Sequence, residues 1–209
     1  MGRRERRMLT VSEIRGVFLH VPKTAGTTIT AAFKSCAFVV PHQKLAAHRA
    51  HYLRLIGGTL PNWHKLFKFS FVRNPWGRFR AYFLNYREHN SPEIDAATYT
   101  HADFQTFVAD MTHQDRLAFT TNELITGDLE LFDFIGQFEH LTRDVQHVAK
   151  CLDIDVPDLP HLNTLKATVS PDWRDYYDEQ TYDIVVEYSA WEIERFGYTF
   201  DDCATQRAA

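Results

Sequence analysis

Residues 17–29 read VFLHVPKTAGTTI, an apolar run followed by a loop of small and hydroxyl-bearing residues and then by a second apolar pattern. The run from Gly16 to Val21 has the length and composition of a buried strand. Apolar residues at helical spacing follow the loop: Ile29, Ala32, Phe33 and Cys36. This stretch predicts a strand, a short loop and a helix in succession.

A second stretch repeats this order. Leu66 to Val72 (LFKFSFV) predicts a strand, and Arg73 follows it directly. Asn74 is expected to cap the next helix, with Pro75 at the first helical position, where a missing N–H costs nothing. The buried stripe of this helix is expected to consist of Phe79, Tyr82, Phe83 and Tyr86.

The remaining elements continue the alternation of strands and helices. Helices are predicted over Leu45–Ile56 and Asp103–Met111, and a strand over Leu131–Phe138. Two further helical stripes consist of Leu141, Val145, Val148 and Leu152, and of Tyr182, Val185, Val186, Ser189 and Ile193. Such alternation favours an α/β fold with a P-loop-like central parallel sheet and helices on both faces. We expect one domain over residues 14–200, with a basic, flexible tail over 1–13 and a C-terminal tail over 201–209.

Composition narrows the class of protein. The 209 residues are 44% hydrophobic and 24% charged, which is typical of a globular domain and excludes disordered or fibrous chains. No run approaches the roughly 18 apolar residues of a membrane span, and no signal peptide is expected. The three cysteines are far apart and form no CxxC pair, so we expect neither a disulfide framework nor a zinc site. A reducing cytoplasm fits this pattern best.

Charge is divided unevenly along the chain. Residues 14–87 hold twelve Lys and Arg and no Asp or Glu, whereas residues from 88 onward carry a net charge of −18. A region of one sign focuses its field on a ligand of the opposite sign, so the first half is expected to hold an anion. The alternative is that these charges lie on solvated faces. The overall net charge of −4 argues against a large nucleic-acid surface.

The loop Pro22–Thr28 suits a phosphate. A small-residue loop that opens a helix presents backbone N–H groups and the positive end of the helix dipole to an anion. Lys23 adds a charge, Gly26 allows close approach, and the candidate binding residues are Lys23, Thr24, Ala25, Gly26, Thr27 and Thr28. The lysine stands at the start of the loop, not at its end as in a Walker A motif, which disfavours a magnesium-dependent kinase. A purely structural turn is the other possibility.

Arg73 is the second candidate ligand residue. Its planar guanidinium suits phosphate, and the helix behind it adds N–H donors. Because ligands bind at the carboxyl ends of parallel strands, the loop and Arg73 are expected to hold anionic groups at the two ends of one nucleotide. Pairing of Arg73 with a carboxylate is the alternative, although residues 14–87 contain none.

These two motifs resemble a known family. VFLHVPKTAGTTI is similar to the 5′-phosphosulfate loop of sulfotransferases, and FKFSFVRNPWGRFRAYF is similar to their 3′-phosphate motif, in the carbohydrate-type branch found in bacterial and Golgi enzymes. IGQFEHL, LPHLN and IERFGYTF resemble later blocks of the same branch. The resemblance implies a sulfotransferase fold, 3′-phosphoadenosine 5′-phosphosulfate (PAPS) as sulfuryl donor, and no metal.

The resemblance also assigns roles to single residues. The family carries a serine eight residues after the arginine, where its hydroxyl helps to hold the 3′-phosphate, but this chain has Ala81. A lost hydrogen bond to a charged group is worth about 1.5–3 kcal/mol, and Arg78 or Arg80 is a candidate to replace it. Lys166 lies where the family closes a loop over the nucleotide, although a solvated lysine is as good an interpretation.

Transfer to a hydroxyl also needs a general base. The family places a glutamate or histidine between its two motifs, and this interval contains histidines but no carboxylate. The segment AAHRAHYLRLIGG resembles the family's stretch around such a histidine, so His48 is the first candidate and His51 the second, with a carboxylate from the acidic half as the alternative.

The leading hypothesis is therefore a PAPS-dependent O-sulfotransferase that acts, with catalytic residues Lys23 and His48 or His51, on a carbohydrate or another small hydroxyl compound. A nucleotide-binding module with weakened catalysis is the second hypothesis, for which Ala81 is the sequence hint. An ATP-using P-loop kinase is the third. No nucleic-acid partner and no stable membrane insertion are expected, and the sequence leaves the oligomeric state open.

Overall fold

The computed structural model describes residues 14–41, 63–90, 101–113, 125, 129–155, 159 and 172–202. Its four strands are β1 (Gly16–His20), β2 (Ala37–Pro41), β3 (Phe67–Val72) and β4 (Phe134–Gln137). They form one parallel sheet in the order β2-β1-β3-β4. A parallel sheet needs crossover connections, which here place β1 and β3 side by side.

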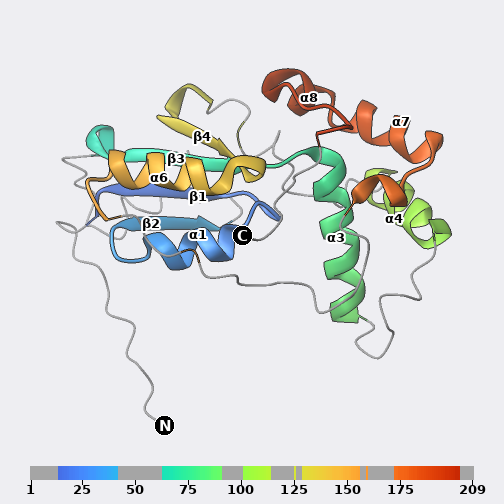
Figure 1. Ribbon diagram of the computed structural model, residues 1–209, viewed down its shortest axis with the longest axis horizontal. Helices are drawn as coiled ribbons and strands as arrows, with labels where there is room; N and C mark the ends of the chain where they lie inside the picture. Colours follow the sequence, from blue (N-terminus) through green and yellow to red (C-terminus); the bar gives the residue numbers. More distant parts are fainter. Residues whose placement is uncertain are drawn as a thin grey trace, which may run out of the picture.

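In the described residues, six helices flank the sheet or extend beyond it: α1 (Gly26–Phe33), α3 (Pro75–Asn90), α4 (His101–His113), α6 (Leu141–Cys151), α7 (Glu179–Tyr188) and α8 (Ala190–Phe196). Four short 3₁₀ turns accompany them: η2 (Trp63–Lys65), η4 (Leu129–Leu131), η5 (Phe138–His140) and η6 (Trp173–Tyr176). The predicted α/β fold with a central parallel sheet flanked by helices is confirmed (Figure 1). The predicted helix over Leu45–Ile56 lies outside the described residues.

Alternation along the strands divides the core in two. Phe18, Phe69 and Phe71 point to one side of the sheet, where they pack with α1 and α6. The Phe18 and Phe69 rings stack with centroids 5.3 Å apart. Val17 and Leu19 point to the other side and join a larger cluster that continues into α3, α4 and α7 beyond the ends of the strands (Figure 1).

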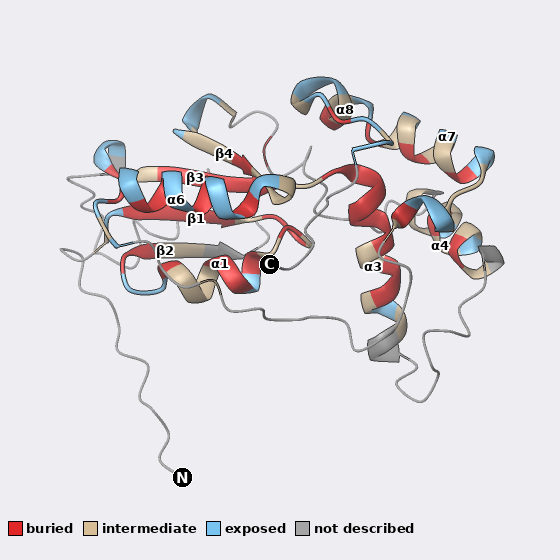
Figure 2. Cartoon of the chain, viewed as in Figure 1, coloured by how far each residue is buried: buried red, intermediate tan, exposed pale blue. Residues whose placement is uncertain are grey.

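Helix α3 begins as expected. The Asn74 side chain accepts a hydrogen bond from the Trp76 N–H at 3.1 Å, and its carbonyl accepts one from Arg78 at 2.9 Å, so Asn74 is the N-cap before Pro75. The first half of α3 is buried on every side (Figure 2). Tyr86, predicted to be buried, is 53% exposed, although Phe83 and Leu84 in the same turn are buried.

Several boundaries differ from the sequence predictions. The predicted strand over 131–138 is shorter, since 3₁₀ turns occupy both of its ends. Strand β2 was not predicted, and it ends in Pro41, which a ladder tolerates only at an edge. The single helix expected near the C-terminus is broken at Ser189, whose N–H bonds to Val185 and whose carbonyl accepts from Ile193.

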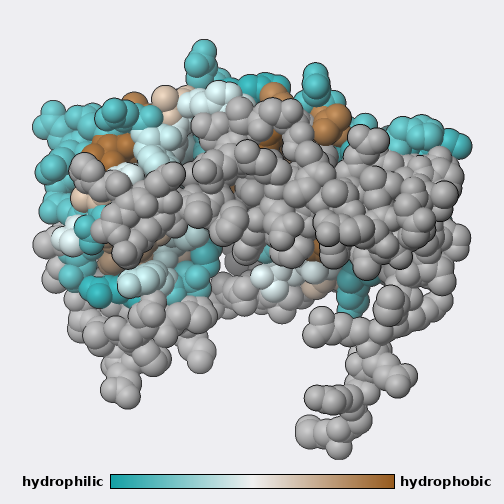
Figure 3. All heavy atoms as spheres, turned by 180° about the vertical axis from the view of Figure 1, so that it is seen from behind, coloured by the Kyte–Doolittle hydropathy of each residue, from teal (hydrophilic) through white to brown (hydrophobic). Residues whose placement is uncertain are grey.

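The two halves of the sequence meet through ion pairs. Cations of the basic half contact carboxylates of the acidic half at 2.8–3.7 Å: Arg15 with Asp153, Lys68 with Asp133, Arg78 with Glu192, and Arg87 with Asp103. Much of the charge asymmetry in the sequence is thus neutralised in the fold. Seen from behind, the surface of the described residues is mostly hydrophilic with small, separate apolar patches (Figure 3). No helix in the described ranges is long and apolar enough to cross a bilayer.

We predict that removing one partner of the Arg78–Glu192 pair lowers the free energy of unfolding strongly, whereas replacing both partners by apolar residues lowers it little. Both side chains are 2% exposed, and burial lowers the pKa of Arg78, but the charge and hydrogen bond of Glu192 outweigh this and raise it. Glu192→Ala should lower the free energy of unfolding by about 3–5 kcal/mol in urea titration, because it leaves a buried charge. Arg78→Met with Glu192→Leu should recover most of this loss.

The exposed Glu187→Ala on α7 is the control and should change stability by no more than about 0.5 kcal/mol. A Glu192→Ala protein as stable as this control would show that the pair does not anchor α8 to α3.

Candidate active site

Three neighbouring strands end at the same edge of the sheet. β1, β3 and β4 are parallel, so the loop after His20, Arg73 after Val72, and Glu139 close behind Gln137 all follow carboxyl ends. This is the edge at which open α/β sheets bind ligands. The structure therefore brings together the two motifs singled out in the sequence.

The loop after β1 is held in an unusual backbone conformation. Lys23 and Ala25 have φ angles of 64° and 63°, the left-handed region that residues with a Cβ rarely enter. Such residues cost of order 1–3 kcal/mol and gather at functional sites. Adjacent left- and right-handed residues turn backbone N–H groups into an anion-binding concavity, and here left-handed Ala25 precedes the helical Gly26. Alanine has no side-chain acceptor, so it does not cap these N–H groups itself.

Lys23 lies at the centre of the loop's contacts. Its ammonium donates to the Asn85 side-chain oxygen and stands 5.9 Å from the centre of the Tyr82 ring, both on α3. Its carbonyl accepts a hydrogen bond from Arg73 Nη1 at 3.2 Å. One residue thus joins the loop after β1 both to α3 and to Arg73.

The threonines of the loop have different environments. Thr24 is fully buried and its hydroxyl donates to the Val21 carbonyl at 2.7 Å, so its side chain faces the protein and only its backbone can reach a ligand. Thr28 is 8% exposed, whereas Thr27 is exposed on the first turn of α1. Among the predicted hydroxyl donors, Thr27 is the more accessible.

Gly26 is required for a reason that the sequence did not show. A Cβ at Gly26 would lie 1.7 Å from His20 Nε2, because the His20 ring fills that space. The ring also stacks on Phe18 with centroids 5.8 Å apart. His20 therefore packs between strand and helix and has a structural role.

Arg73 is a half-buried cation surrounded by other charges. Its guanidinium lies 4.1 Å from the centre of the Phe138 ring. Burial lowers the pKa of Arg73 to about 10; Glu139 opposes this change, and Arg80 and Arg78 add to it. Around this turn stand the cations Arg73, Arg78 and Arg80 and the anions Glu139 and Glu192. The described part of this cluster has one positive charge in excess, which suits an anionic ligand.

The remaining predicted residues lie on α3 or outside the described parts of the chain. Ala81 is half-buried on α3. Of its two suggested replacements, Arg78 is held by Glu192, and Arg80 is 9% exposed with its guanidinium 5.1 Å from the centre of the Tyr176 ring. The predicted catalytic residues His48 and His51, and the loop residue Lys166, lie outside the described residues.

Sequence reasoning missed several residues of this site. Tyr82 was assigned to the core and Asn85 was not considered, although both contact Lys23. Phe138 and Glu139 were noted only as part of IGQFEHL. Their place after a strand end was the available signal.

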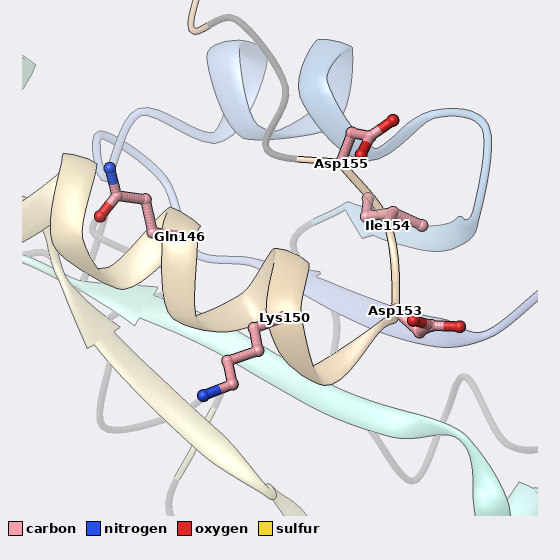
Figure 4. Close-up of a pocket in the computed structure, with 5 residues that line it drawn as sticks. All are labelled: Gln146, Lys150, Asp153, Ile154 and Asp155. Atoms are coloured by element: carbon pink, nitrogen blue, oxygen red, sulfur yellow. The ribbon is translucent and has the colours of Figure 1, made fainter.

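A hollow in the surface lies away from this candidate site. It is lined by Gln146, Lys150, Asp153, Ile154 and Asp155 at the end of α6 (Figure 4). Arg15, which precedes β1, donates to the Asp153 carbonyl, so this hollow is at the amino end of the strands. Its side chains point in different directions (Figure 4), and it is not the candidate active site.

A family model described as the sulfotransferase family matches residues 6–199. The chain belongs to the sulfotransferase family. The crystal structure of mouse sulfotransferase SULT7A1 complexed with PAP (3′-phosphoadenosine 5′-phosphate) is similar in fold, with a TM-score of 0.55 and 14% identity over 96% of this chain and 91% of that one. No curated protein sequence matches the chain. The family match confirms the identification of a sulfotransferase, and the structural match confirms its fold.

We predict that Gly26 is constrained by the His20 ring. Gly26→Ala should lower the free energy of unfolding of this sulfotransferase by about 1–3 kcal/mol, as expected for overpacking. In a His20→Ala background the same change should cost less. Urea titration of the wild type, both single variants and the double variant gives the coupling energy between the two sites, expected at about 0.5–3 kcal/mol. Thr27→Ala, on the exposed side of the same turn, is the control. An equal cost of Gly26→Ala in both backgrounds would show that the ring is not the constraint.

Proposed function

We propose that this sulfotransferase transfers a sulfuryl group from PAPS to a hydroxyl of a carbohydrate or another small acceptor. The observation that carries the proposal is the hydrogen bond from Arg73 to the Lys23 carbonyl, which joins the two nucleotide motifs at one edge of the sheet. The excess positive charge around Arg73 supports the same interpretation. The carbohydrate class rests on the sequence resemblance.

The proposed donor site has a 5′ side and a 3′ side. On the 5′ side, Lys23 and the backbone of residues Thr24–Thr28 hold the phosphosulfate, with the Thr27 hydroxyl as an accessible donor. On the 3′ side, Arg73 and the start of α3 hold the 3′-phosphate. Ala81 offers no hydroxyl there, and Lys166 is proposed as a further ligand of the nucleotide.

The chemistry of transfer assigns a task to each group. When bound, PAPS supplies the sulfuryl group: the acceptor oxygen bonds to sulfur as the bond from sulfur to the 5′-phosphate oxygen breaks. Lys23 and the loop N–H groups stabilise the charge that grows on that phosphate oxygen. His48, or His51 in its place, accepts the proton of the acceptor hydroxyl. No step of this scheme requires a metal ion.

Tyr86 supports an acceptor with a flat face. It follows Tyr82 and Asn85, the two contacts of Lys23, on α3, and it is the aromatic side chain most exposed in the described residues. Aromatic rings stack on sugar faces and on phenols alike. A screen of neutral glycans, anionic glycans and phenols, read as transfer of labelled sulfate, separates these acceptor classes.

We predict selective stabilisation by PAP. At a concentration 100 times its Kd, PAP should stabilise the protein by about 2.7 kcal/mol in a thermal shift measurement, and ATP with magnesium should not. Arg73→Gln should weaken PAP binding by about tenfold or more, since a hydrogen bond to a charged group is lost. Stabilisation by ATP with magnesium, but not by PAP, would favour the hypothesis of an ATP-using kinase. PAP binding without transfer of labelled sulfate to any acceptor would favour the weakened module.

We predict that His48 is needed for turnover but not for donor binding. His48→Ala should reduce transfer of labelled sulfate by at least about a hundredfold, the usual contribution of a general base, with an unchanged Kd for PAP. His51→Ala is the matched variant three residues later. Full activity of His48→Ala together with loss of activity in His51→Ala would move the role to His51, and full activity of both would move it to another group.

A further inference from the structure

The motif IGQFEHL ends beside the Arg73–Asn74 turn. Glu139 Oε1 accepts a hydrogen bond from the backbone N–H of Asn74 at 2.8 Å. Its Oε2 accepts one from the Tyr198 hydroxyl at 3.4 Å. Both oxygens are thus engaged by parts of the chain that are distant in sequence.

The C-terminal segment reinforces the same turn. The Asn74 side chain donates to the Thr199 carbonyl at 2.8 Å, and Gln137 Nε2 donates to the Phe196 carbonyl at 3.3 Å. Asn74 is fully buried, and its polar groups are hydrogen-bonded to Glu139, Thr199 and the Trp76 N–H. Its side chain caps α3 while Glu139 accepts its N–H, an arrangement like a capping box whose acidic member comes from another part of the chain.

The same motif also contacts Arg73. Phe138 supports the guanidinium from one face at 4.1 Å. The charge of Glu139 raises the pKa of Arg73 against the effect of burial. Burial raises the pKa of Glu139 overall, and the Asn74 N–H and the charge of Arg73 oppose part of this rise. Carboxylate and guanidinium therefore stabilise each other's charged form.

We infer that Glu139 is a positioning residue for the 3′-phosphate site, which aims Arg73 and the start of α3 at the phosphate. A carboxylate repels a phosphate, so Glu139 acts through Arg73 and Asn74 and not as a ligand itself. This inference rests on the proposed function, because it assumes that Arg73 meets the 3′-phosphate.

The test measures how much of the binding depends on the 3′-phosphate. The Kd values of PAP and of adenosine 5′-phosphate, which lacks that group, are measured by calorimetry on the full chain, and their ratio is the 3′-phosphate preference. Glu139→Ala and Glu139→Asp should reduce this preference by about tenfold or more while the Kd of adenosine 5′-phosphate stays unchanged. Glu139→Asp keeps the charge but shortens the side chain, and it tests the inference if the alanine variant does not fold.

Glu139→Gln is the rescue variant, since it keeps the length and one acceptor oxygen for the Asn74 N–H. It should retain the preference to within about threefold, because it keeps the hydrogen bond that orders the turn. Glu194→Ala on the exposed side of α8 is the control. Retention of the preference by the alanine or aspartate variant, or its loss in the glutamine variant, overturns the inference. A wild-type protein without any 3′-phosphate preference instead contradicts the proposed function.

Discussion

The hydrogen bond from Arg73 to the carbonyl of Lys23 is the contact on which the site depends. It exists because β1 and β3 are neighbours in a parallel sheet, so that their carboxyl ends emerge together. Lys23 presents that carbonyl from a left-handed backbone conformation, which costs free energy and must be held by its surroundings. Asn85 and Tyr82 on α3 supply part of that support.

Charge explains why this edge and not another suits an anion. The sequence places its cations in one half and its carboxylates in the other, and the fold recombines them in pairs such as Lys68–Asp133 and Arg78–Glu192. The uneven distribution of charge along the sequence therefore predicts a larger anion-binding surface than the fold leaves. Arg73 is half-buried beside the buried Arg78 and Arg80, and this cluster carries one positive charge more than its described carboxylates.

Local signals in the sequence were read correctly, and contacts between distant segments were not. Val17–Ile29 and the Asn74–Pro75 helix start are short-range patterns, and both are confirmed. The constraint on Gly26 depends on where the His20 ring packs, and the exposure of Tyr86 depends on which elements pack against α3. Neither feature can be predicted from the spacing of apolar residues along the sequence. The expected ligand roles of Thr27, Ala81 and Lys166, and the choice of His48 as base, stay predictions.

The two sides of the proposed donor site are therefore built differently. The 5′ side is one continuous segment, in which β1, the loop and α1 are tied by Gly26 and His20. The 3′ side is assembled from the end of β3, the turn after β4 and the C-terminal residues around Tyr198 and Thr199. The parts of the 3′ side come from distant segments, whereas the 5′ side is continuous in sequence and is also supported by Asn85 and Tyr82 on α3. The hydrogen bond from Arg73 to the Lys23 carbonyl joins the two sides.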